Sequence, residues 1–186
     1  MDAAFQLMAE RGIEGTSMDA IAEASGVSKA TIYKHWADKD ALVLESIGRA
    51  YGLDREPMRF DSGDLLQDLI AFLKHRPPEF ARLRDRLAPQ IIAYAGVNTR
   101  FGIAWKSKVL DPGRAQAMEL IRRGIDNGLL RPDLDASLAV ALLLGPLIYA
   151  HITRLTPERP EDLPEGVARA FWRAFAVQPP PERRRV

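Results

Sequence analysis

The residues from Ser28 to Lys39 carry the side chains with the clearest chemistry in this sequence. They include three lysines and one aspartate, a local charge of +2 with His35 neutral, inside a segment 1–52 that holds 5 basic and 8 acidic residues. Lysine and tyrosine can reach phosphate oxygens, and threonine, alanine and lysine can meet base edges or thymine methyl groups. Positive charge gathered on one short helix of an otherwise acidic unit is expected where that helix approaches nucleic-acid phosphates.

The elements that would position these side chains are two short helices separated by a tight turn, within TSMDAIAEASGVSKATIYKHW at 16–36. The small Ala22 allows the two helices to cross closely, and Gly26 falls where the turn needs a positive φ. Val27 and Ile32 supply apolar contacts back to the first helix. This order of small, glycine and apolar residues is what a helix-turn-helix requires, and we place that motif at about 17–36.

Capping residues support the same pair of helices. Thr16 with Asp19 fits a capping box for the first helix, Ser28 is expected to cap the second, and Asp38 the next. Taken alone, the spacing is also compatible with an ordinary helical hairpin that has a solvated basic face.

The whole run from Asp2 to Ile47 resembles the N-terminal domain of the TetR (tetracycline-repressor) family of bacterial regulators. The match includes DAAFQLMAERGIEGTSMDAIAEASGVSKATIYKHWADKDALV, with Tyr33 ahead of a basic pair and the aromatic-x-Asp-Lys-Asp-Ala-Leu entry to the following helix. Trp36 stands where phenylalanine is more usual. The resemblance implies an all-α protein, in which a three-helix DNA-binding head is joined by a fourth helix to an all-helical ligand-binding and dimerisation domain.

Carried over by position, the resemblance assigns residues 28–35 to the recognition helix. Phosphate contacts are implied for Thr16, Tyr33 and Lys39, and core positions for Ile21, Ala22, Val27, Ile32 and Trp36. Family members usually begin with a basic arm and more of the first helix, whereas this sequence begins within that helix, so no arm contact is included. The full predicted set of DNA-binding residues is Thr16, Ser28, Lys29, Ala30, Thr31, Tyr33, Lys34, His35 and Lys39.

Helical spacing continues through the rest of the chain, and strand-like alternation with hairpin turns is missing. We expect a helix-turn-helix domain over 1–52, a helical effector-binding and dimerisation domain over 53–178, and a disordered tail over 179–186. The helices expected after residue 52 cover 64–74 with Ser62 as its cap, 79–94, 99–109, a helix opened by Pro112 and stopped by Gly128, 135–155 kinked at Pro146, and 165–176.

The stretch Ala136 to Thr153 has no formally charged residue and is just long enough to raise the question of a membrane span. Gly145-Pro146 interrupts it and no cluster of Lys or Arg flanks it, so a buried helix is the preferred interpretation, with no membrane partner. The run GIDNGLLRPDLDASLAVALLLGPLIYAHI also resembles one TetR subgroup. That resemblance implies a homodimer through the last two long helices, which would bury both faces of this one.

An effector pocket in the regulatory domain is implied by the family. Its candidate lining residues have the ordinary alternative of being plain core, because aromatic and methionine side chains at helical spacing usually are. His75 and His151 are possible polar anchors. The candidates are Phe72, Tyr94, Phe101, Trp105, Met118, Ile121 and Tyr149.

Composition excludes several other classes. The 186 residues have a net charge of +1 and contain no cysteine, which removes disulfides, thiolate nucleophiles, zinc fingers and iron–sulfur ligation. Glycine-rich phosphate loops, His-Glu-x-x-His and Gly-x-Ser-x-Gly are missing, and the three histidines have no ligand at metal spacing. We therefore predict no catalytic residue, no metal and no cofactor other than a small-molecule effector.

The sequence thus predicts a ligand-responsive regulator, more readily a repressor than an activator, that binds palindromic double-stranded DNA as a homodimer. The N-terminus lacks the features of a signal peptide, and a cytoplasmic location is expected. The alternative is a helical protein–protein adaptor whose basic helix is incidental. The operator, the regulated genes, the effector and the sign of regulation are not specified by these residues.

Overall fold

The computed structural model describes residues 2–56, 58–75, 81–153 and 162–177, without the side chains of Asp2, 81–85 and His151. The chain forms two compact units: unit 1 comprises Met1–Pro57 and Arg76–Pro112, and unit 2 comprises Met58–His75 and Gly113–Val186. The regular secondary structure of the described residues is helical, apart from an isolated antiparallel bridge between Leu130 and Ala176. The predicted all-α class is confirmed.

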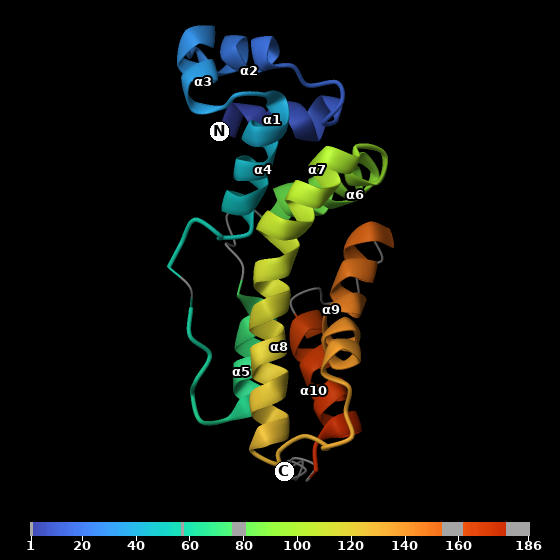
Figure 1. Cartoon of the computed structure of the whole chain (residues 1–186). Helices are drawn as coiled ribbons and strands as arrows, with labels where there is room; N and C mark the ends of the chain where they lie inside the picture. Colours follow the sequence, from blue (N-terminus) through green and yellow to red (C-terminus); the bar gives the residue numbers. More distant parts are fainter. Residues whose placement is uncertain (1, 57, 76–80, 154–161, 178–186) are drawn as a thin grey trace. The chain divides into compact units, whose positions relative to one another are not determined.

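Unit 1 combines the N-terminal helices with the helices after residue 80 (Figure 1). Phe5 and Met8 of the first helix, Leu42 of the fourth, Leu87 and Phe101 lie in one continuous core. Packing therefore joins residues 81–110 to the head, whereas the functional boundary at 52/53 stays a prediction. The helices are α1 (Asp2–Arg11), α2 (Met18–Ser25), α3 (Lys29–His35), α4 (Lys39–Ala50), α6 (Ala81–Val97), α7 (Thr99–Trp105) and the π-helix η2 (Lys106–Leu110).

The local signals around α2, α3 and α4 can be compared with the sequence directly. Gly26 has φ +67° and ends α2 in the left-handed conformation, as predicted. Ser28 and Asp38 cap α3 and α4, the Asp38 side chain accepting the Ala41 N–H at 2.8 Å. The predicted Thr16 capping box is wrong, because the N-cap of α2 is the next residue, Ser17, whose side chain accepts the Ala20 N–H at 3.1 Å.

A π-turn precedes α8 (Asp111–Asp126), a helix of 16 residues. The Asp111 N–H donates to the Lys106 carbonyl, five residues back. Pro112 explains this widened turn, because its ring would clash with the carbonyl four residues earlier and it has no N–H to offer. The sequence predicts that Pro112 opens this helix; α8 begins one residue earlier, at Asp111, and follows η2 directly. Gly128, with φ +68°, stands just beyond its end as predicted.

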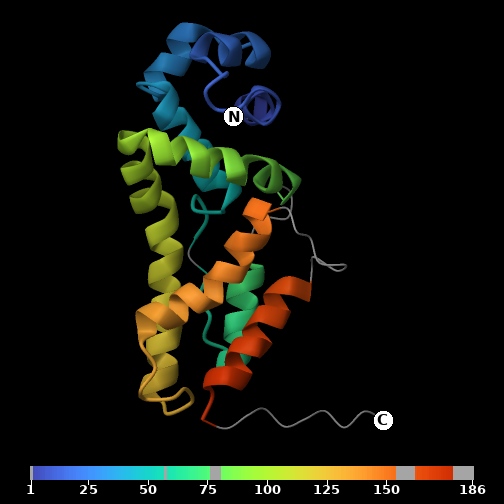
Figure 2. The ribbon, with the colours of Figure 1, turned by 90° about the vertical axis from the view of Figure 1, so that its right-hand side faces the viewer.

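Unit 2 contains α5 (Leu65–Lys74), α8, α9 (Ala136–Thr153) and α10 (Leu163–Phe175). Figure 2 shows α9 and α10 side by side, and α10 also packs against α5. The predicted cap of α5 was Ser62; the structure assigns that role to Asp64, which accepts the Gln67 N–H at 3.1 Å. The fully buried centre of the unit is formed by Leu69, Ile121, Leu130 and Leu143.

Two polar groups join the helices of unit 2. Asp68 is 3% exposed; it accepts the Ser62 N–H at 2.9 Å and pairs with the Arg123 guanidinium. Glu165 on α10 pairs with Lys74 on α5 at 2.7 Å and with Arg169 at 2.8 Å. The Lys74 ammonium first, and then the Arg169 guanidinium, lower the pKa of Glu165 from 4.5 to about 2.

Helix α9 runs through Pro146 as one element. No helix in the described parts of the chain is long and apolar enough to cross a membrane. The predicted tail at 179–186 lies outside the described residues.

Candidate nucleic-acid interface

Helix α3 presents nearly all of its side chains outward. Ile32 is 3% exposed and anchors the helix in the core of unit 1, whereas Lys29, Ala30, Thr31, Tyr33, Lys34 and His35 are all exposed. These six side chains are therefore accessible to a nucleic acid. The core positions that the resemblance implied are confirmed for Ile21 and Ala22, which are buried. Trp36 is half-buried. The implied core position of Val27 is wrong, because Val27 is 40% exposed.

The hydroxyl groups at the start of α3 are engaged with one another. Ser28 Oγ accepts the Thr31 N–H at 3.2 Å and lies 2.8 Å from Thr31 Oγ1. This cap fixes the first turn of the helix while both side chains stay exposed. A hydroxyl oxygen keeps acceptor capacity beyond one bond, so the pair can still meet a donor on a base edge.

The cations of the segment have different surroundings. Lys29 Nζ lies 2.8 Å from Asp19 Oδ2 of α2, and this hydrogen bond raises the pKa of Lys29. Lys34 forms no ion pair with any described residue, so its ammonium is open to solvent. His35 stacks against Trp36, with ring centroids 5.6 Å apart.

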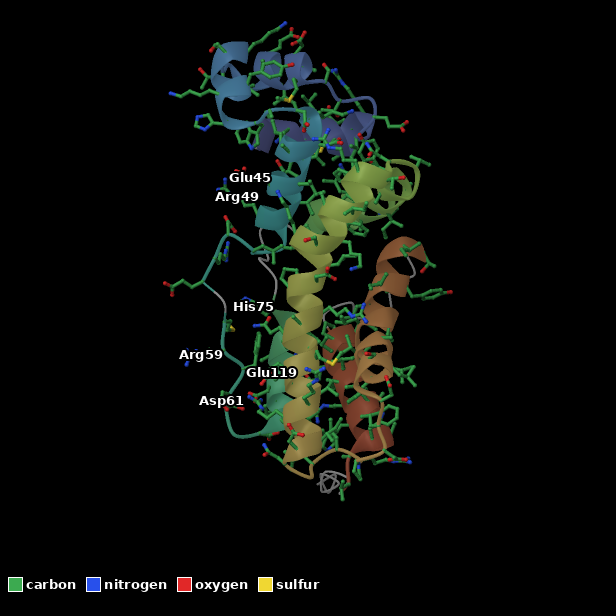
Figure 3. All side chains as sticks on the ribbon, in the orientation of Figure 1. Glu45, Arg49, Arg59, Asp61, His75 and Glu119 are labelled. Atoms are coloured by element: carbon green, nitrogen blue, oxygen red, sulfur yellow. The ribbon has the colours of Figure 1, made fainter. Side chains whose placement is uncertain are left out.

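Trp36 connects the end of α3 to α4. Its Nε1–H donates to Glu45 Oε2 at 2.9 Å, and Figure 3 shows Glu45 on α4. The tryptophan that replaces the usual phenylalanine thus gains a hydrogen bond that phenylalanine could not make. This bond helps to hold the recognition helix against the helix that follows it.

Lys39, predicted to bind a phosphate, points its ammonium toward the protein. Lys39 Nζ donates to the carbonyl oxygens of Ile13 at 2.9 Å and Glu14 at 3.4 Å, and it lies 5.7 Å from the centre of the Tyr94 ring. In this arrangement the residue ties the α1–α2 loop to the start of α4. Its role at a phosphate stays a prediction, which the structure does not favour.

Thr16 is 2% exposed, and its hydroxyl donates to the Gly12 carbonyl at 2.7 Å. A buried hydroxyl that already donates cannot reach a phosphate as placed here. The adjacent Ser17 is exposed at the N-terminus of α2, where backbone N–H groups favour an anion. The residues predicted from the sequence included Thr16 and not this exposed neighbour.

A polar network attaches the start of α4 to the α6–α7 corner. Tyr94 Oη donates to Asp40 Oδ1 at 2.9 Å, and Asn98 Nδ2 donates to Tyr94 Oη at 3.1 Å and to Asp40 Oδ2 at 3.4 Å. Asn98 also caps α7 by accepting the Phe101 N–H at 3.0 Å. Burial and the hydrogen bond to Asp40 raise the pKa of Tyr94. These hydrogen bonds hold the start of α4 against the α6–α7 corner.

Comparison with known proteins identifies this helical head. The profile of bacterial regulatory proteins of the tetR family matches residues 1–46, and that of the tetracyclin repressor-like C-terminal domain matches residues 60–170. The chain belongs to the TetR family. TetR-family proteins are non-enzymatic DNA-binding transcription factors, so this protein is a DNA-binding transcriptional regulator with α2 and α3 as its helix-turn-helix.

Relatives of this TetR-family protein cover most of its length. The uncharacterized HTH-type transcriptional regulator YdeS from Bacillus subtilis is 30% identical over 149 residues, which are 80% of this chain and 74% of that protein. The DNA-binding transcriptional repressor TetR from Mycobacteroides abscessus is 28% identical, over 83% of this chain and 86% of that one. The fatty acid degradation regulator FadR from Bacillus halodurans shares the fold, with a TM-score of 0.72, 23% identity, and 92% and 95% of the two chains covered.

The seven residues predicted to line an effector pocket fall in both units. Tyr94, Phe101 and Trp105 belong to unit 1, and the other four to unit 2. Phe101 is 1% exposed, Ile121 is fully buried, and Tyr149 is 61% exposed. The pocket stays a prediction. Of its two possible polar anchors, His75 meets Phe60 edge to face, with ring centroids 5.8 Å apart, and the side chain of His151 lies outside the described residues.

No group of three or more His, Asp or Glu side chains in the described ranges is placed to hold a metal ion. The polar clusters of the protein are paired instead, as Asp68 with Arg123 and Glu165 with Lys74 show.

Proposed function

We propose that this TetR-family regulator represses transcription in the bacterial cytoplasm by binding a palindromic operator as a homodimer, and that a small-molecule effector releases it. The observation that carries the proposal is the outward face of α3. One buried residue, Ile32, anchors a helix whose other side chains are exposed and include the open ammonium of Lys34. Such a helix fits the major groove, with Thr31 and Ala30 toward base edges and Tyr33 and Lys34 toward phosphates.

A second observation supports the homodimer. Helix α9 has apolar residues on two opposite sides. Ala139, Val140, Leu143 and Leu147 face the core of unit 2, whereas five large apolar residues on the other side are exposed, a set too extensive to be left in water. These are Leu138 (56% exposed), Leu142 (44%), Ile148 (48%), Tyr149 (61%) and Ile152 (44%).

The neighbouring helix α10 offers a surface that a partner helix can approach closely. Gly166, Ala170 and Ala174 recur every four residues and are exposed, so their small side chains lie along one side of the helix. We infer that α9 and α10 pair with their copies as a four-helix bundle related by a two-fold axis. The same axis would relate the two recognition helices, as a palindrome requires.

Release by an effector would act through α4. Its first residues are bonded to the α6–α7 corner by Asp40, Tyr94 and Asn98, so a ligand that prefers another position of this corner would also shift the start of α4. The ligand would then favour a separation of the two recognition helices that does not fit the operator.

Selection from random duplexes with the purified protein, followed by sequencing, tests the proposal. An enriched palindrome with half-sites about one helical turn apart is the expected result. Sedimentation at micromolar concentration should show a dimer. A monomer that enriches no sequence would contradict the proposal and favour the adaptor function.

A further inference from the structure

The ion pair between Lys29 and Asp19 lies at the part of the head that would face DNA. Lys29 is the first residue of α3, and Asp19 is in the first turn of α2. Their charged atoms are 2.8 Å apart, and the two side chains are 61% and 63% exposed. The pair is therefore not a buried structural element. It lies at the surface where a phosphate would compete with Asp19 for the same ammonium.

The surroundings of the pair are acidic. A shallow hollow between α2 and α3 is lined by both members of the pair and by the exposed Glu23, one turn further along α2. The hollow thus contains two carboxylates and one ammonium. Among the described side chains, Lys29 forms its ion pair with Asp19 and not with Glu23. A phosphate approaching the start of α3 would meet a net negative charge rather than a free cation.

We propose that Asp19 acts as an internal competitor of DNA: its carboxylate occupies Lys29 and lowers the affinity of the head for DNA phosphates of any sequence. This inference rests on the proposed function. A cation that is already paired releases no counterion from DNA unless it first leaves its partner, and the abandoned carboxylate then lies beside phosphates. The free energy needed to separate Lys29 from Asp19 is the same on every duplex. Asp19 therefore keeps sequence-independent binding weak, and the base contacts of α3 distinguish one DNA sequence from another.

The energetics make this competition effective. An exposed ion pair contributes little to stability, so the pair is not needed to fold the head. Its effect on DNA binding is larger than its effect on folding, because phosphates and carboxylate compete for one ammonium in the bound state. Asp19 therefore influences function more than structure.

The test compares Asp19→Asn with the protein itself on two probes: a duplex pool of random sequence and the duplex enriched by selection. Without its partner, Lys29 becomes free to bind a phosphate, and the slope of log affinity against log salt steepens by about 0.9 for each head bound. Asp19→Asn should therefore bind both probes more tightly at 50 mM salt. That gain should shrink about 3.5-fold per head by 200 mM salt.

Glu23→Gln is the matched control, since it removes one negative charge from the same helix and the same hollow without freeing Lys29. Both changes are then repeated with Lys29→Met. The gain from Asp19→Asn should fall in that background to the size of the gain from Glu23→Gln, because only the removal of one negative charge remains, whereas any gain from Glu23→Gln should persist. Helical circular dichroism and thermal unfolding show that each variant is folded.

Several results would overturn the inference while leaving the proposed function intact. Equal gains from Asp19→Asn and Glu23→Gln while Lys29 is present, or a gain from Asp19→Asn that keeps its full size with Lys29→Met, would mean that only net charge matters. If Asp19→Asn binds the enriched duplex more weakly than the protein itself does, Asp19 positions Lys29 for a contact with a base. If the protein itself binds neither probe, the proposed function fails, and this inference fails with it.

Discussion

Replacing Lys39 by methionine separates two roles that this lysine could have. Its ammonium donates to the Ile13 and Glu14 carbonyls at 2.9 and 3.4 Å and lies over the Tyr94 ring. A hydrogen bond from a charged donor contributes about 1.5–3 kcal/mol, and a cation over an aromatic ring about 0.5–1 kcal/mol. Because Lys39 is half-buried and the second bond is long, we expect a total loss of about 2 kcal/mol. Methionine keeps the apolar stem, so packing changes little.

A loss of this size lowers the midpoint of thermal unfolding by about 4–8 °C for a chain of this length. Circular dichroism at 222 nm measures the midpoint, and hydrogen exchange of the amides in the α1–α2 loop shows where the protection is lost. Lys34→Met is the matched control, because Lys34 is exposed and has no ion pair with a described residue. It should change stability by less than about 0.5 kcal/mol. It should also flatten the salt dependence of DNA binding by about 0.9 per head.

The two variants are thus expected to behave oppositely. The reasoning is refuted if Lys39→Met leaves the unfolding midpoint unchanged and flattens the salt dependence as Lys34→Met does. That pattern would show that Lys39 leaves the two carbonyls and binds a phosphate, as its sequence position suggested.

Three further outcomes are expected. Asp68→Asn should lower the free energy of unfolding in urea by about 2–3 kcal/mol, since it breaks the ion pair with Arg123 at a carboxylate that is 3% exposed. Asp61→Asn, at a carboxylate that is 79% exposed, should lower it by less than about 0.5 kcal/mol. The folded-state pKa of Glu165 is lowered to about 2, so its stabilising effect is present above pH 4.5 and is lost as the pH falls toward 2; the stability difference from Glu165→Gln should vanish over that range. Leu142→Glu should raise the dimer dissociation constant at least about tenfold in sedimentation, because it would bury an unpaired charge. Ile103→Glu is the control, because Ile103 is also a large apolar side chain that is exposed (67%), and it should leave that constant unchanged.

Local features of the head could be predicted from sequence because their causes are local. Gly26 must reverse the chain, Ser28 must accept an N–H at the start of α3, and Ile32 is the apolar residue that anchors this helix. The cap of α2 could not be predicted in the same way. Thr16 and Ser17 are adjacent hydroxyl residues, and which of them caps the helix is decided by the bond from Thr16 to the Gly12 carbonyl, a feature of the loop's fold.

Contacts between segments far apart in the chain could not be predicted from the sequence. Asp40 and Tyr94 are 54 residues apart, and no spacing rule connects them. From the sequence alone, Asp40 is only a favourable negative charge in the first turn of α4. Similarly, the apolar character of α9 predicted burial on both faces, but only the structure separates the side that contacts the core, such as Leu143, from the exposed side that includes Leu142.

The charge of the recognition segment shows why composition alone misjudges an electrostatic surface. Counting residues gives +2 for 28–39, but the three lysines are not equivalent. Lys29 is paired with Asp19 and Lys39 donates to loop carbonyls, which leaves Lys34 as the cation of this segment without a described partner. One open ammonium per head supplies little sequence-independent affinity, since each neutralised phosphate contributes one counterion. In the proposed dimer, tight binding must then depend on base contacts by exposed side chains of α3 and on two heads engaging DNA together. Such a dimer would gain most of its affinity only where both half-sites fit.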